Sequence, residues 1–139
     1  MVAACPFPYP RGTPIRIQRM AESLAKNGHE VHVAAYHLGE SPADTDYVIH
    51  RINRIPFYKK FDPGPSVIKL LFVDPLLTLK LLRLVSKFQF DLIYAHHYEG
   101  FMGALPARLS GKLPGIDEGV EWRRGIRKIL RAFYREIFL

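Results

Sequence analysis

The sequence has a single cysteine, Cys5, among its 139 residues. Without a second cysteine in the chain there is no internal disulfide and no metal cluster built on cysteine ligands, which favours a reducing compartment. In the Leu-rich middle of the chain the longest strictly apolar run covers only residues 70–73, far short of the roughly 20 residues that span a bilayer. Residues 1–6 also lack the basic start and the long apolar core of a secretory signal. These absences predict a cytoplasmic chain.

The composition is that of a globular protein, with 48% hydrophobic and 24% charged residues. The length suits one domain of ordinary size, so an activity that needs two full lobes must obtain the second one elsewhere. The net charge of +7 is unevenly distributed, because residues 122–139 hold six basic residues and one acidic residue. The charge is therefore mainly a property of the C-terminal segment.

Short apolar segments alternate with helical patterns along the chain. Segments rich in apolar and β-branched residues are expected as strands at 1–5, 29–36, 46–55 and 91–95, the third at a sheet edge. Apolar residues at helical spacing predict helices at 13–28, 66–88 and 100–109. This alternation predicts an α/β fold, a Rossmann-like parallel sheet of about four strands with flanking helices, which binds ligands outside the carboxyl ends of its strands.

The helix boundaries have their own signals. Thr13 and Pro14 fit the N-cap and first position of the first helix, and Gly28 supplies its stop. Asp74 and Pro75 interrupt the second helical segment and can start a fresh helix. The loop at residues 6–14 precedes the first helix and contains Gly12 but no G-x-G-x-x-G, so it is either a phosphate-binding loop or a stiff turn over the sheet end.

A polar cluster, His96, His97 and Glu99, follows the fourth expected strand. A histidine there can hydrogen-bond a sugar or nucleotide hydroxyl, or it can take up a proton. The alternative is structural: the histidine packs against the loop, and Glu99 is the first residue of the next helix. Adjacent strand-end histidines point apart, so we expect no metal site, and no other cofactor is expected. The sequence lacks the G-x-S-x-G and P-loop motifs, and Cys5 is expected as an inert core thiol.

The C-terminal segment, residues 117–139, is predicted to form a basic amphipathic helix that follows a domain at residues 1–116. The apolar stripe of this helix either docks on the domain or contacts an anionic membrane surface. Because an aromatic and aliphatic stripe is poorly suited to binding nucleic acid, nucleic acid is not an expected partner. The candidate membrane-facing residues are Trp122, Arg123, Arg124, Arg127, Lys128 and Arg131.

Two motifs resemble a known family. Residues 4–16, which read ACPFPYPRGTPIR, and the later Gly28-His29-Glu30-Val31-His32-Val33 are similar to the N-terminal, acceptor-side domain of family 4 retaining glycosyltransferases with the GT-B fold. Residues 91–100, DLIYAHHYEG, resemble the second marker of the same family. The resemblance covers about residues 1–116.

The resemblance implies a nucleotide-sugar donor and a sugar, polysaccharide or lipid-linked acceptor, with the transferred sugar beside His96. It implies substrate-binding roles for Gly12, Thr13, Arg16, His97, Glu99 and Gly100. Many members act at the cytoplasmic membrane face, which agrees with peripheral contact at the inner face of the membrane.

The sequence also departs from the family pattern. The C-terminal lobe of the GT-B fold has no room in this chain, and residues 115–119 stand where relatives have a fifth strand. We therefore expect a fragment or an acceptor-side half, inactive without a second lobe supplied in trans, and a sheet edge without that strand. The alternative is a non-catalytic module that binds a membrane or a protein through the C-terminal helix.

Overall fold

The computed structural model describes residues 1–40, 42, 44–59, 67–96, 100 and 106, and the backbone of residues 116–117. Within these residues the strands are β1 (Val2–Ala3), β2 (His32–Ala35), β3 (Val48–Arg51), β4 (Ile93–His96) and β5 (Ile116–Asp117). The helices are α1 (Gly12–Lys26) and α2 (Asp74–Lys87), and a π-helical turn, η1 (Lys69–Val73), leads into α2.

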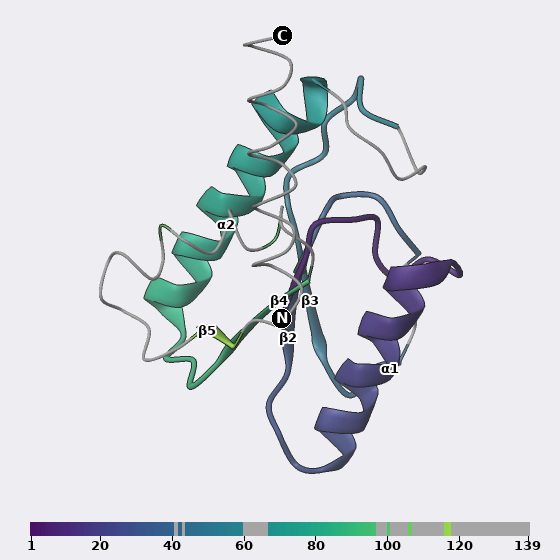
Figure 1. The fold of residues 1–139 in the computed structure, drawn as a ribbon, viewed down its shortest axis with the longest axis vertical. Helices are drawn as coiled ribbons and strands as arrows, with labels where there is room; N and C mark the ends of the chain where they lie inside the picture. Colours follow the sequence, from purple (N-terminus) through teal and green to yellow (C-terminus); the bar gives the residue numbers. More distant parts are fainter. Residues whose placement is uncertain are drawn as a thin grey trace, which may run out of the picture.

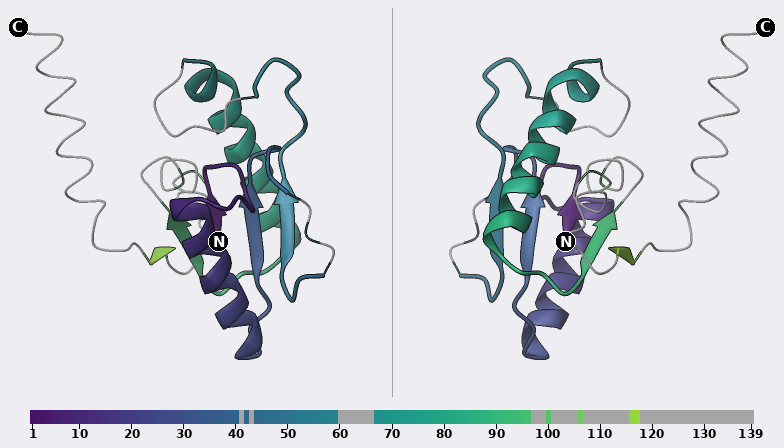
Figure 2. Two further views of the ribbon diagram at one scale, coloured as in Figure 1. Left: turned by 90° about the vertical axis from the view of Figure 1, so that its right-hand side faces the viewer. Right: turned by 90° about the vertical axis from the view of Figure 1, so that its left-hand side faces the viewer.

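All described strands pair in parallel, in the order β3-β2-β1-β4-β5 (Figure 2). Helices α1 and α2 lie on opposite sides of this sheet (Figure 1). The fold is therefore the Rossmann-like α/β fold predicted from the alternation of strands and helices, with β3 at an edge as predicted.

The two faces of the sheet bury separate cores, because neighbouring residues of a strand point to opposite faces. Val2 and Ala34 belong to the core under α2, whereas Ala3, Val33 and Ala35 belong to the core under α1. The α1 side of the core is completed by Phe7, Ile17, Ala21, Val31 and Tyr47. The α2 side includes Tyr36, Ile52, Val73, Leu77, Leu81, Leu84, Val85 and Ile93.

The expectation that β4 has no neighbour on its outer side is wrong. Ile116 pairs with Ile93 and Asp117 with Tyr94 in parallel register, so the two-residue β5 stands where the fifth strand was expected to be missing. An exposed strand edge gains hydrogen bonds from any segment that can pair with it, and this stabilises even a very short strand. The local sequence has only one apolar residue there and gave no strand pattern.

The ends of α1 follow the sequence signals in part. At the C-terminus, Gly28 N–H donates to the carbonyl of Ala25 at 2.9 Å and His29 N–H to that of Leu24 at 3.2 Å, with Gly28 at φ +86°. This is a Schellman motif, which confirms Gly28 as the stop. At the N-terminus the expected cap is wrong: Arg11, with φ −152° and ψ 132°, takes the N-cap position instead of Thr13.

The fresh helix expected at Asp74 and Pro75 is confirmed, since α2 begins at Asp74, but the expected interruption is wrong because the chain stays helical from η1 into α2. The residue that precedes α2, Val73, has αR dihedral angles, φ −74° and ψ −46°. Pro75 is accepted because it falls in the first turn of α2, where its missing N–H is not needed. The two residues therefore mark the change from π-helical to α-helical hydrogen bonding.

Some expectations lie outside the described residues. Of the helix expected at 100–109, only Gly100 and Pro106 are described, and both are helical. The second half of the loop before η1 and the predicted C-terminal helix, with Trp122, Arg123, Arg124, Arg127, Lys128 and Arg131, also lie outside. In the part of the chain that is described, no helix is long and apolar enough to cross a membrane.

Candidate functional site

The carboxyl ends of four strands meet in one row across the sheet. Strand pairing aligns Arg51 with Ala35, Ala35 with Ala3, and Ala3 with His96. Parallel strands that are paired in this way point aligned side chains to the same face, and Ala3 and Ala35 face α1. His96 therefore lies on the α1 face, at the edge where the loop from β1 leads into α1.

The loop between β1 and α1 is fixed by a second loop that follows β2. Phe7 N–H donates to the carbonyl of Leu38 at 3.0 Å, and Glu40 N–H donates to that of Pro8 at 2.9 Å. The Phe7 side chain is fully buried and packs on Tyr47, with the ring centroids 6.2 Å apart. These contacts hold the loop over the carboxyl edge of the sheet, and the peptide bond between Phe7 and Pro8 is cis.

Helix α1 starts with exposed backbone donors and positive charge. Gly12, the first residue of the helix, has φ +41°, and a Cβ atom there would meet nothing within 4 Å. Glycine is thus required by the backbone angle and not by lack of space. No side chain of the described residues caps this end, and its first turn has no acidic residue. With Arg11 and Arg16 exposed beside it, the helix start is suited to an anionic group.

His96 is buried, with 7% of its surface exposed, and its ring lies 4.7 Å from that of Tyr94, centroid to centroid. Gly100 lies against β1: a Cβ atom there would be 3.3 Å from the carbonyl oxygen of Val2. The chain at Gly100 therefore lies against β1. The other two members of the expected cluster, His97 and Glu99, lie outside the described residues.

The structure thus brings together two groups that are far apart in the sequence. Gly12, Thr13 and Arg16 begin α1, and His96 ends β4, all at the carboxyl edge. Cys5 is half-buried in the loop between them, a position less enclosed than the core position expected.

Sequence reasoning missed three residues that shape this edge. Arg51 Nη2 donates to the carbonyl of Phe7 at 3.1 Å and also to that of Glu40, which links the end of β3 to both loops. His37 Nε2 donates to the carbonyl of Tyr58 at 3.0 Å. Gly39, with φ +133°, passes so close to Phe7 that no side chain fits. Position was the available signal for His37 and Gly39, which closely follow the strand expected at 29–36, whereas Arg51 lies inside the strand expected at 46–55.

A second polar cluster lies away from this edge, at the start of β2. His32 Nδ1 lies 2.8 Å from His50 Nε2, and His32 Nε2 lies 2.9 Å from Glu30 Oε1. Burial lowers the pKa of His50 below its usual 6.5, and His32, Lys80, Lys87 and the amino group of residue 1 lower it further. Within the described ranges, no group of three or more His, Cys, Asp and Glu side chains is placed to hold a metal ion.

The strand order and the helices on both faces define a Rossmann-like α/β domain. Folds of this class bind ligands at the carboxyl edge of the sheet. Residues 10–117 match the family described as Glycosyltransferase Family 4. This match covers most of the chain, and the chain belongs to that family, in the region of its N-terminal GT-B lobe. Membership implies a nucleotide-sugar donor and an acceptor. No curated protein matches the chain.

Proposed function

We propose that this chain is the acceptor-side lobe of a retaining sugar transferase. In this proposal the backbone N–H groups of Gly12 and Thr13 donate to a phosphate or to an acceptor hydroxyl, and Arg16 supplies positive charge beside them. His96 contacts the sugar that is transferred, assisted by His97, while Glu99 and Gly100 set the path of the chain after β4.

The observation that supports this proposal best is the alignment of Ala3 with His96. It brings the end of β4 next to the start of the loop that leads to Gly12, on one face and at one edge of the sheet. A sugar attached to a diphosphate needs this combination, because its phosphates and its reacting carbon must be held at the same time. The start of α1 supplies the anion-binding part, and the histidine supplies a polar group for the sugar.

We further propose that transfer needs a second lobe. Negative charge develops on the nucleotide diphosphate as it leaves, and it must be met by donors that are already oriented. The start of α1 offers few of them, since Pro14 lacks an N–H and Gly12 and Thr13 also serve the acceptor side. The family match covers residues 10–117, in the region of the N-terminal GT-B lobe.

The proposal is tested by NMR of the histidine side chains in the full chain. Nucleotide sugars (a panel of UDP- and GDP-linked hexoses) are titrated while the imidazole signals are followed, with the His96 signal assigned through His96→Asn. We expect the His96 signal to shift and that of His29 to stay in place, because His29 is exposed beyond the far end of α1. Arg16→Gln should weaken the interaction by about tenfold, since an ionic hydrogen bond to phosphate is lost.

The matched control is Arg19→Gln, which removes one exposed positive charge from the same helix, one turn further from its start. Equal effects of the two arginine variants, or no shift of His96 with any nucleotide sugar, would contradict the proposed site. The need for a second lobe is tested separately by turnover: robust transfer by the chain alone would refute that part and leave the binding site standing.

A further inference from the structure

Large apolar side chains are exposed on η1, on the residues just before it and on the preceding loop. Val67 is 73% exposed, Leu70 68% and Phe57 66%, values usual for charged surface residues. The rings of Phe57 and Phe72 pack edge to face, with centroids 6.3 Å apart, and so join the loop to the helical turn. We name the whole set the η1 patch: Phe57, Val67, Ile68, Leu70, Leu71 and Phe72.

The exposure follows from which residue of η1 faces the sheet. A buried stripe with a four-residue repeat runs from η1 into α2. It contains Lys69 and Val73 of η1, followed by Leu77 and Leu81 of α2. Lys69 is only 9% exposed, and its Nζ lies 5.7 Å from the centre of the Tyr36 ring. A lysine thus takes the inward position while its apolar neighbours face outward. A helix that is apolar on its outer side needs a partner that is not water.

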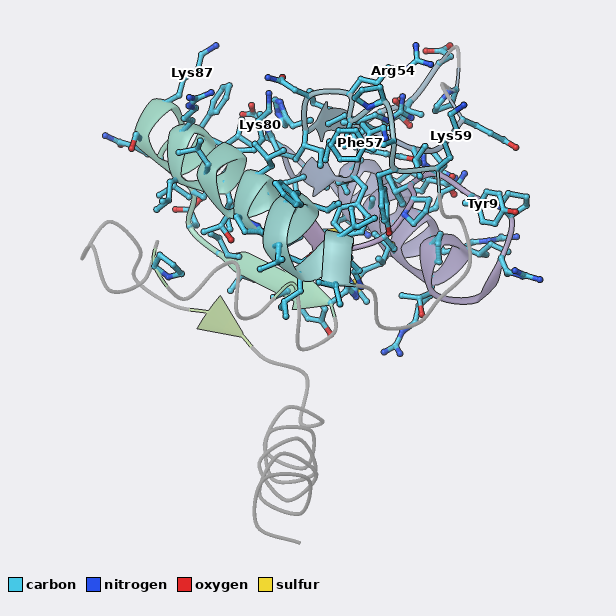
Figure 3. The ribbon with its side chains drawn as sticks, turned by 90° about the horizontal axis from the view of Figure 1, so that it is seen from above. Tyr9, Arg54, Phe57, Lys59, Lys80 and Lys87 are labelled. Carbon is cyan, nitrogen blue, oxygen red and sulfur yellow. The ribbon has the colours of Figure 1, made fainter. Side chains whose placement is uncertain are left out.

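The surroundings of the η1 patch are positively charged. Residues 48–59 and 67–90 contain a single acidic residue, Asp74, whose Oδ1 accepts a hydrogen bond from the Tyr36 hydroxyl at 2.5 Å. Lys80, Arg54 and Lys59 lie along the side of the molecule on which Phe57 is found, and Lys87 continues this line (Figure 3). The basic residues of the two segments are Arg51, Arg54, Lys59, Lys69, Lys80, Arg83 and Lys87.

We propose that the η1 patch docks on an anionic lipid surface, with its apolar side chains in the interface and the neighbouring cations at the headgroups. Apolar side chains bordered by lysine and arginine are complementary to such a surface. A second copy of the chain is a poor occupant, because a symmetric contact would bring the two sets of cations together. This surface is distinct from the predicted C-terminal helix, and it does not depend on the proposed sugar transfer.

Lipid binding is measured with the full chain by co-sedimentation with vesicles, in the absence of any nucleotide sugar. Vesicles of phosphatidylcholine with phosphatidylglycerol should bind the chain, and vesicles of phosphatidylcholine alone should not. The double variant Leu70→Gln and Leu71→Gln should weaken binding by about tenfold or more, because two apolar side chains no longer leave water. The matched control is Leu24→Gln with Leu92→Gln, two exposed leucines outside the η1 patch, and it should bind like the unchanged chain.

Charge is tested by a second pair of double variants. Arg54→Gln with Lys59→Gln should weaken binding by about fivefold for each cation lost. Arg19→Gln with Lys26→Gln removes the same charge from exposed positions of α1 and should have a smaller effect. Circular dichroism of each variant confirms that the fold is kept, and the charge pair leaves every apolar side chain in place.

Three results would overturn the proposal. The first is that the unchanged chain does not bind anionic vesicles. The second is that Leu70→Gln with Leu71→Gln binds them as well as the unchanged chain does, which would assign lipid contact to another surface. The third is a dimer in sedimentation velocity that this variant abolishes, which would make the η1 patch a contact between copies of the chain.

Discussion

Replacing Gly39 with alanine tests whether the loop before α1 is held by the loop that follows β2. A Cβ atom on Gly39 would lie 2.4 Å from the carbonyl oxygen of Phe7 and 2.6 Å from its carbonyl carbon. Both are backbone atoms, so no side-chain rotation relieves the clash. Phe7 cannot retreat easily either, because it is fully buried and accepts a hydrogen bond from Arg51.

The expected loss has two parts. Alanine at φ +133° is strained by about 1–3 kcal/mol, and the steric overlap adds about 1–3 kcal/mol, as overpacking does elsewhere. The control is Gly28→Ala, at φ +86° with nothing within 4 Å, which should lose only about 1–2 kcal/mol through backbone strain. Urea unfolding followed by circular dichroism gives both free energies. A loss for Gly39→Ala no larger than for Gly28→Ala would refute the close contact between the two loops.

Two further predictions concern buried polar contacts. The pKa of His50 is lower in the folded chain than its usual 6.5, so the unfolded chain binds a proton at this residue more readily. The free energy of unfolding should therefore fall as the pH drops below about 6.5. His50→Asn should flatten this pH dependence, which is measured by urea unfolding at several pH values. Tyr36→Phe removes the hydrogen bond to Asp74 and should reduce the free energy of unfolding by about 1.5–3 kcal/mol. An unchanged midpoint in urea would show that this bond contributes nothing.

Patterns within short segments predicted most of the elements. The positions of β2, β3 and β4, the stop of α1 at Gly28 and the alternation of strands and helices were all legible in the sequence, because each depends on spacings of a few residues. The two positions that matter most for the candidate site, Gly12 at the start of α1 and His96 at the end of β4, were also found this way. Arg51, His37 and Gly39 were missed because their partners, Phe7 and Tyr58, are distant in the sequence.

Errors arose where a local signal competed with a longer-range contact. Thr13 and Pro14 form a good helix start, yet α1 begins two residues earlier, with Arg11 as its N-cap and Gly12, at positive φ, as its first residue. Asp74 and Pro75 form another, yet packing of Lys69 and Val73 against the sheet side keeps the preceding turn helical. Residues 116–117 have no strand pattern, and they form the two-residue β5 because β4 offers them a partner.

By itself, therefore, the sequence determined the α/β alternation and the motifs that mark Glycosyltransferase Family 4. Only the tertiary structure decided that Ala3 aligns with His96, which places the two motifs at one edge, and that Lys69 faces inward, which leaves the η1 patch exposed. The physical reason is the same in both cases. Periodicity fixes which side chains share a face of one element. Strand register, and which face of a helix packs on the sheet, depend on contacts with other elements.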